Sequence, residues 1–135
     1  MTAPKPLRVL VYSDDIDIRQ QVILALGRRP HRDLPEVTYV EVATEPVVIQ
    51  NMDAGGIDLA ILDGEAVPAG GMGIAKQLKD EIYECPPLVV LTGRPQDAWL
   101  ATWSRADAAI PHPLDPIALA ETVVALLRDR VPATA

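Results

Sequence analysis

Five short apolar runs alternate along the chain with five segments whose apolar residues recur at helical spacing. This alternation limits the possible folds more than any other feature of the sequence. The apolar runs cover residues 7–12, 37–42, 57–62, 88–91 and 108–110, and the helical segments cover residues 17–27, 44–56, 74–82, 96–105 and 117–128. Strict alternation predicts an α/β domain with a doubly wound, five-stranded parallel sheet covered by five helices.

The composition fits a globular protein and argues against several functions. The chain has 135 residues, 49% of them apolar, which indicates one domain with its core in residues 7–128. A net charge of −7 argues against nucleic-acid binding. No apolar run approaches membrane-spanning length and the N-terminus lacks a signal peptide, so we expect a soluble, cytoplasmic protein without membrane insertion. The single cysteine, Cys85, is expected to pack in the core.

Polar side chains follow three of the predicted strands. Asp14 and Asp15 follow the first, Asp63 ends the third, and Thr92 ends the fourth. In a sheet of order 2-1-3-4-5 these strands are neighbours, so the side chains should meet in one crevice. Clustered carboxylates repel one another unless a hard cation lies among them, which predicts a weak Mg²⁺ site that also includes Glu65. The Thr92 hydroxyl would then lie near any oxyanion attached to Asp63.

Ordinary structural roles are the alternative explanation for each of these residues alone. Strand ends are commonly polar, and Ser13 is a good helix N-cap. Three adjacent polar strand ends together favour a site. The sequence has neither a dinucleotide-binding fingerprint nor a Walker-type loop. Residues 28–36 contain three arginines, which we interpret as a solvated loop rather than an anion site, because no other group is expected to converge on it.

Four segments resemble the CheY-like receiver domain of bacterial response regulators. They are RVLVYSDDIDIR, DLAILD, LVVLTG and ADAAIPHPLDPIAL, and the resemblance extends over residues 7–128. It implies a flavodoxin-like fold in which Asp63 is the phospho-accepting aspartate and Thr92 the switch hydroxyl. It also implies that Mg²⁺ binds beside Asp63.

Several positions depart from the family pattern. The usual acidic pair falls on Ser13 and Asp14, so Asp15 is a candidate replacement for the missing carboxylate. The phosphate-contacting lysine is replaced by His112, and the aromatic switch position falls on Ala109. The loop between residues 63 and 73 is about two residues longer than is usual in the family. These changes predict slow phosphorylation or none, with the fold retained.

Three functions are consistent with these features. The first is a stand-alone, atypical receiver that acts by docking to a protein partner such as a histidine kinase, with no output domain. The second is a phosphorylation-independent pseudo-receiver, serving as an adaptor or accessory subunit of a larger complex. A faint similarity to orphan receivers suggests the respiratory NADH dehydrogenase as such a complex. The third, a small flavodoxin-like enzyme, is disfavoured because no nucleophile–base pair is evident.

A partner surface is predicted on the last strand and its flanking helices. By alignment, Ile117 and Val124 face outward from the final helix, and Ala109 leaves a shallow spot beside them. Trp103 on the preceding helix would anchor the patch, whereas Trp99 is expected to pack inward. The patch would bind a partner protein or a second copy of the chain, although scattered apolar surface residues are the simpler explanation.

Overall fold

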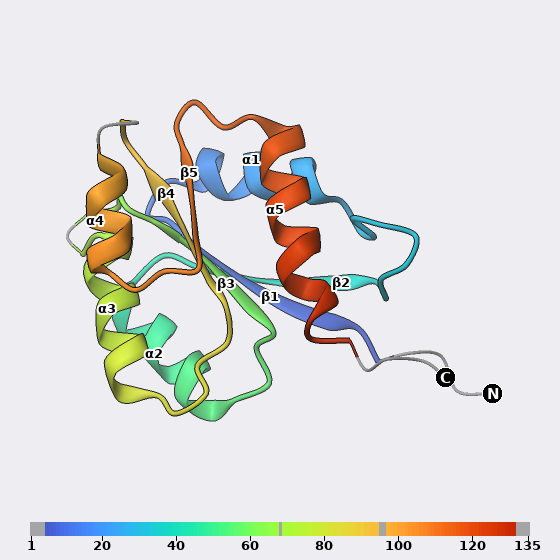
Figure 1. Cartoon of the computed structure of the whole chain (residues 1–135), viewed down its shortest axis with the longest axis horizontal. Helices are drawn as coiled ribbons and strands as arrows, with labels where there is room; N and C mark the ends of the chain where they lie inside the picture. The colour runs from blue at the N-terminus through green and yellow to red at the C-terminus, as the bar shows by residue number, and fades with distance from the viewer. Residues whose placement is uncertain (1–4, 68, 95–96, 132–135) are drawn as a thin grey trace.

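The computed structural model describes residues 5–67, 69–94 and 97–131 and confirms the predicted architecture. Five parallel strands form one sheet of order β2-β1-β3-β4-β5, and five helices connect them (Figure 1). None of the helices in these ranges has the length and apolar content needed to cross a membrane. The elements are β1 (Leu7–Tyr12), α1 (Ile16–Leu26), β2 (Val37–Val42), α2 (Glu45–Ala54), β3 (Leu59–Asp63), α3 (Gly71–Glu81), β4 (Leu88–Thr92), α4 (Ala98–Trp103), β5 (Ala108–Pro111) and α5 (Pro116–Arg128).

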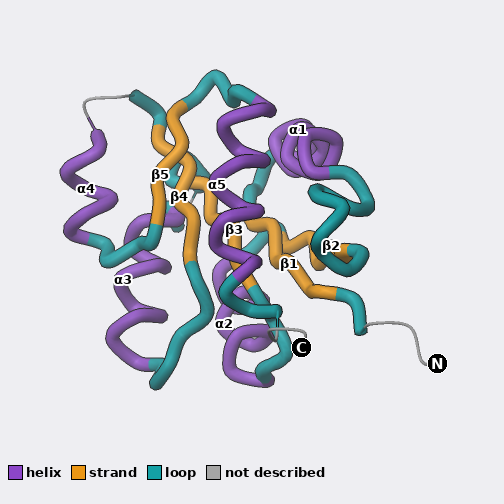
Figure 2. The backbone as a smooth tube through the Cα atoms, turned by 45° about the vertical axis from the view of Figure 1, so that its right-hand side comes forward, coloured by secondary structure: helices purple, strands orange, loops and turns teal. Residues whose placement is uncertain are grey.

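The sheet separates two hydrophobic cores. Helices α1 and α5 lie side by side on one face, and α2, α3 and α4 cover the other (Figures 1 and 2). Alternate residues of β1 enter different cores: Val9 and Val11 pack with α1 and α5, whereas Leu10 and Tyr12 pack on the opposite face. Burial on both faces explains why the strands read as continuous apolar runs in the sequence.

Helices α1 and α5 each start at an acidic cap. Asp15 is the N-cap of α1 and accepts a hydrogen bond of 2.8 Å from the Asp17 backbone. The expectation that Ser13 caps this helix is wrong, because Ser13 lies two residues earlier and is fully buried. Asp115 caps α5 in the same way, with a proline at the first helical position. The acidic residues after β1 and β5 therefore have a structural role as well as any chemical one.

Helix α3 starts three residues before the predicted start at residue 74. Two glycines suggested a loop, but Gly71 is already helical and lies against the end of β3. A Cβ atom there would be 2.7 Å from the Leu62 carbonyl carbon, so only glycine permits this approach. The close contact brings the start of α3 next to Asp63.

The predicted outward orientation of Val124 is wrong. Val124 is only 7% exposed and belongs to the core that α1 and α5 share. Because α5 packs against both the sheet and α1, it buries a wider stripe than contact with the sheet alone would require. Ile117, near the start of the helix, is 70% exposed as predicted.

The predicted orientation of Trp99 on α4 is also wrong. Trp99 was expected to pack inward, but 67% of its surface is exposed, and Trp103 is 52% exposed. The inner stripe of this six-residue helix continues through Ala101 to Ser104, which are both buried. Both tryptophans therefore lie on the outer face. The helix is also shorter than the predicted 96–105, and residue 96 lies outside the described ranges.

Candidate functional site

A cavity of about 730 Å³ lies at the carboxyl ends of the central strands. Five of the residues predicted for the site reach it, from the end of β3 and from the loops after β1, β3 and β5, because the parallel strands end on the same side of the sheet. Thr92 ends β4 next to this cavity and is buried, and its carbonyl accepts a 2.8 Å hydrogen bond from the His112 backbone. The lining residues are Asp14, Asp15, Ile18, Asp63, Glu65, Gly93, Arg94, Asp97 and His112.

The carboxylate of Asp63 is held by two hydrogen bonds. Oδ2 accepts one of 2.8 Å from the Ser13 hydroxyl, and Oδ1 accepts one of 2.9 Å from the Glu65 backbone. His112 Nε2 lies 3.5 Å from the same Oδ1, where a protonated imidazole forms an ion pair. Asp63 itself is only 3% exposed. The arrangement fixes the carboxylate at the floor of the cavity.

The other acidic residues have distinct local partners. Asp14 Oδ1 accepts a 3.3 Å hydrogen bond from the Val67 backbone, and Asp15 is committed to capping α1. Glu65 fills the space beside Gly93, where a Cβ atom would collide with its carboxylate. Across the described ranges, no three acidic, histidine or cysteine side chains are grouped closely enough to hold a metal ion alone.

This donor set still fits Mg²⁺ in one respect. Mg²⁺ needs only one or two protein carboxylates, because waters and phosphate oxygens complete its coordination. Asp14 and Asp63 are the residues that would hold it, with Glu65 beside them. Asp15 is less suited because its carboxylate already caps a helix. Bound Mg²⁺ would neutralise the clustered negative charge.

Ser13, Asp63 and His112 are not arranged for nucleophilic catalysis. The Ser13 hydroxyl donates to Asp63 rather than to the histidine, and Asp63 lies between the other two side chains. Ser13 is also fully buried. Activation of a serine requires a base that hydrogen-bonds the hydroxyl, with the serine open to its substrate. These contacts instead position the Asp63 carboxylate.

Two features of the site were missed by sequence reasoning. The hydroxyl of buried Tyr12 donates a hydrogen bond to the Ala69 carbonyl, which ties the long loop after β3 to the end of β1. Burial raises the pKa of Tyr12, and the charges of Asp14, Glu45 and Asp63 raise it further. The position of this tyrosine at the end of the first apolar run was the sequence feature that could have indicated the contact.

The second missed feature is an ion pair at the cavity rim. Arg94 Nη2 lies 3.1 Å from Asp97 Oδ1, and this hydrogen-bonded contact raises the pKa of the arginine. Both side chains line the cavity, so a cation faces the acidic residues from the β4 side. The two residues lie three apart, a spacing that was visible in the sequence.

The predicted partner surface is only partly assembled. Trp103 on α4 and Ile117 on α5 are exposed and Ala109 on β5 is half-buried, but Val124 is buried and does not contribute. Helices α4 and α5 run in the same direction, which puts Trp103 at the opposite end of this surface from Ile117 (Figure 1). Trp99, near the start of α4, is at the same end as Ile117.

Comparison with known proteins identifies the family of this chain through individual relatives rather than through a family model. No family model matches the chain. Two curated proteins from strains of Mycobacterium tuberculosis, both named as response regulatory proteins, are each 70% identical over 122 residues, which is 90% of this chain and 92% of theirs.

Solved structures show the same fold. The receiver domain of a Francisella response regulator has a TM-score of 0.78 at 16% identity and covers 94% of this chain and 100% of its own. The chemotaxis response regulator CheY4 of Vibrio cholerae has a TM-score of 0.73 at 21% identity and covers 90% of this chain and 99% of its own. With the 70% identity of the mycobacterial proteins, the conclusion is that this chain belongs to the response regulators and has the CheY-like receiver fold.

Proposed function

We propose that this chain is an atypical receiver that works through protein contacts and accepts a phosphoryl group slowly at Asp63. The observation that carries the proposal is the Asp63 carboxylate, which is fixed at the end of β3 by Ser13 and the Glu65 backbone. A fixed carboxylate beside acidic and imidazole groups suits phosphoryl transfer, which depends on positioning and charge stabilisation.

In the proposed reaction, an Asp63 oxygen forms a bond to phosphorus while the bond from phosphorus to the leaving oxygen of the donor breaks. The product is an acyl phosphate on Asp63. Protonated His112 and the Thr92 hydroxyl would contact the phosphoryl oxygens, and Mg²⁺ held by Asp14 and Asp63 would supply the remaining positive charge. The reaction is slow because Ser13 occupies a position where the family usually has a carboxylate, and because histidine is charged only when protonated.

Incubation with acetyl phosphate and Mg²⁺, followed by intact-protein mass spectrometry, tests this reaction. We expect partial modification that is absent in Asp63→Asn. Asp53→Asn, which removes an exposed carboxylate on α2, is the matched control and should be modified like the wild type. Complete absence of modification of the wild type would contradict a phospho-accepting role.

A phosphorylation-independent adaptor is the second candidate. Two observations favour it: Asp63 is almost fully buried, and Ala109 cannot provide the rotating aromatic side chain of a conventional switch. An adaptor would bind its partner equally well as wild type and as Asp63→Asn. The two proteins should therefore be compared in affinity purification from the native cell. Equal recovery of the partner favours the adaptor, and loss of binding in Asp63→Asn favours the receiver that signals.

The α4–β5–α5 face is the proposed contact surface in both cases. Trp99, Trp103 and Ile117 are its exposed apolar residues. The Trp99→Ala,Trp103→Ala double variant should lose the partner, whether a histidine kinase, a larger complex or a second copy of the chain. Leu24→Ala is the control, because Leu24 is an exposed apolar residue on α1. Undiminished partner binding by the folded double variant would refute this surface.

A further inference from the structure

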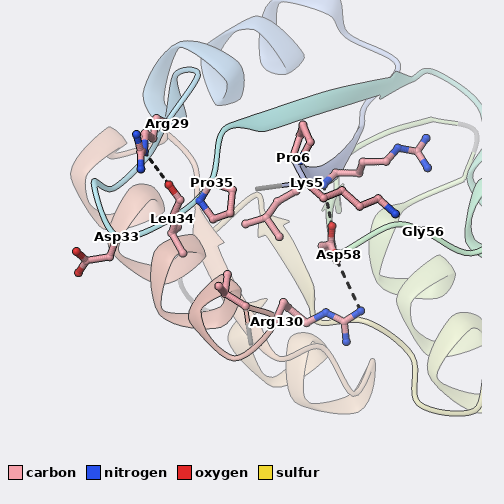
Figure 3. Close-up of a pocket in the computed structure, with 12 residues that line it drawn as sticks. Lys5, Pro6, Arg29, Asp33, Leu34, Pro35, Gly56, Asp58 and Arg130 are labelled. Carbon is pink, nitrogen blue, oxygen red and sulfur yellow. Dashed lines mark hydrogen bonds and ion pairs between the residues drawn. The ribbon is translucent and has the colours of Figure 1, made fainter. Parts of the chain in front are cut away.

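A second cavity, of about 600 Å³, lies at the amino-terminal ends of the strands, opposite the end at which Asp63 lies. Its lining comes from the start of β1, the loop after α1, the loop before β3 and the segment after α5 (Figure 3). This volume is within the range of small-molecule sites. Loops far apart in the sequence therefore enclose a space large enough for a metabolite.

Positive charge predominates in this second cavity. Four cationic side chains line it, together with two carboxylates: Lys5, Arg8, Arg29 and Arg130, with Asp33 and Asp58. This excess is notable in a chain whose net charge is −7. The cavity is therefore suited to an anion.

The two carboxylates leave part of this charge uncompensated. Asp58 accepts a 2.8 Å hydrogen bond from the Arg8 backbone and lies 3.9 Å from the Arg130 guanidinium (Figure 3). Asp33 points away from the cavity and pairs with Arg128 at 3.7 Å. Within the described ranges, the side-chain charges of Lys5 and Arg8 are in no ion pair. These are the groups that an incoming anion would neutralise.

The walls of the cavity are apolar and partly fixed. Leu34 and Leu7 are buried at its base, and Pro6, Pro35 and Val131 complete the walls. The Arg29 guanidinium donates a 2.7 Å hydrogen bond to the Leu34 carbonyl, which holds the loop after α1 in place. The Arg8 guanidinium lies against Gly56, where a Cβ atom would be 3.1 Å from Nη1. An apolar surface bordered by cationic side chains is typical of a site for an amphipathic ligand.

We propose that this cavity binds a small organic anion, with its phosphate or carboxylate group held by Arg8 and Lys5 and its apolar part against Pro6. The ligand lies too far along the sheet to take part in chemistry at Asp63. The site is independent of whether Asp63 is phosphorylated.

Phenyl phosphate is a suitable probe because it combines a phosphate with an apolar ring. In titrations followed by amide chemical shifts on the full chain, saturable shifts should be confined to the neighbourhood of Arg8, Gly56 and Asp58. Inorganic phosphate, which lacks the ring, should bind at least about tenfold more weakly. Shifts centred on Asp63, or no saturable shifts, would overturn the proposal.

Arg8→Gln should weaken phenyl phosphate binding by about tenfold, because it removes a charge-assisted contact. Arg28→Gln is the matched control: it removes the same charge from an exposed residue that does not line the cavity, and it should leave binding unchanged. Unchanged amide shifts around Asp63 would verify that both variants are folded. Equal weakening by the two variants would mean non-specific attraction to charge and would refute the site. Preferential binding to phosphatidylglycerol vesicles, tested by sedimentation, would assign the basic groups to a lipid surface and also refute it.

Discussion

The two cavities lie at opposite ends of the same sheet and have opposite charge. The cavity at the carboxyl ends of the strands contains five carboxylates with one arginine and one histidine. The cavity at the amino ends contains four cationic side chains with two carboxylates. The molecule is thus polarised along its strands, although its overall charge is strongly negative.

The direction of the helices accounts for much of this polarity. In a parallel α/β fold every helix runs antiparallel to the strands, so helix N-termini collect at one edge of the sheet and C-termini at the other. N-termini favour carboxylates and C-termini favour cations. Asp15 and Asp115 cap α1 and α5 at the first edge. Arg29 and Arg130 follow the ends of the same helices at the second edge. The direction of the helices therefore favours this charge separation whether or not either cavity binds a ligand.

The tight packing of the acidic edge gives the largest expected effect. Gly71→Ala should lower the free energy of unfolding by about 2–3 kcal/mol, because the added methyl group collides with the β3 backbone. Gly73→Ala, two residues later in the same helix, has open space around it and should be neutral or stabilising by up to about 1 kcal/mol. Urea denaturation measures both. Similar values for the two variants would contradict the close contact at Gly71.

Loss of the Ser13 hydroxyl should have a somewhat smaller effect. Ser13→Ala removes the donor to the buried Asp63 Oδ2 and should cost about 1–3 kcal/mol of unfolding free energy. In the Asp63→Asn background the same substitution should cost less, because a neutral amide is less demanding of a donor than a carboxylate. A double-mutant cycle by urea denaturation measures the difference. Additive effects would show that the two side chains are not coupled.

Mg²⁺ should stabilise the acidic edge modestly. At ten times its dissociation constant, a ligand of the folded state adds about 1.4 kcal/mol, or roughly 5 °C in melting temperature for a domain of this size. Thermal denaturation with and without millimolar MgCl₂ should show this shift in the wild type and in Asp53→Asn, but little of it in Asp63→Asn. A wild-type melting temperature unaffected by Mg²⁺ would remove the metal from the proposed mechanism.

The smallest expected effect is a difference in how salt changes the pKa of two tyrosines, Tyr12 beside the acidic cavity and Tyr39 away from it. Burial raises the pKa of Tyr39 to about 12, whereas the raised pKa of Tyr12 also reflects nearby carboxylates. About 1 M NaCl should therefore lower the Tyr12 pKa and leave that of Tyr39 nearly unchanged, as measured by ultraviolet difference titration against Tyr12→Phe and Tyr39→Phe. Equal salt responses would argue against the electrostatic difference.

The raised pKa of Tyr39 also makes the stability of the protein depend on pH. A raised tyrosine pKa means that the unfolded chain loses its proton first, so stability present below about pH 10 is lost as the pH rises towards about 12. Tyr39→Phe should flatten this alkaline loss. It should also cost about 1 kcal/mol at neutral pH, because the Tyr39 hydroxyl donates to the Gly27 carbonyl. Denaturation at neutral and alkaline pH tests both parts.

Sequence patterns predicted the features that depend on local periodicity. The apolar runs located all five strands, and the polar residues after them located the acidic cavity. Orientation within helices was less predictable: Trp99 and Val124 were misplaced because their burial depends on which neighbours α4 and α5 meet. The roles of Asp63 and His112 remain predictions.

The basic cavity was missed for a related reason. The arginine-rich loop after α1 was interpreted as solvated because nothing else was expected to converge on it. In the folded chain Lys5, Arg8 and Arg130 join Arg29 there. Lys5 and Arg130 come from opposite ends of the chain, and no local pattern indicates that such distant residues meet.

Strands β1 and β3 are tied to each other by side chains at both of their ends. The Arg8 backbone donates to Asp58 at one end, and the Ser13 hydroxyl donates to Asp63 at the other, with four residues between the contacts on each segment. A slip of one residue would break both bonds and turn every side chain of the strand into the wrong core. The paired strands β1 and β3 therefore hold the two cavities at a fixed separation.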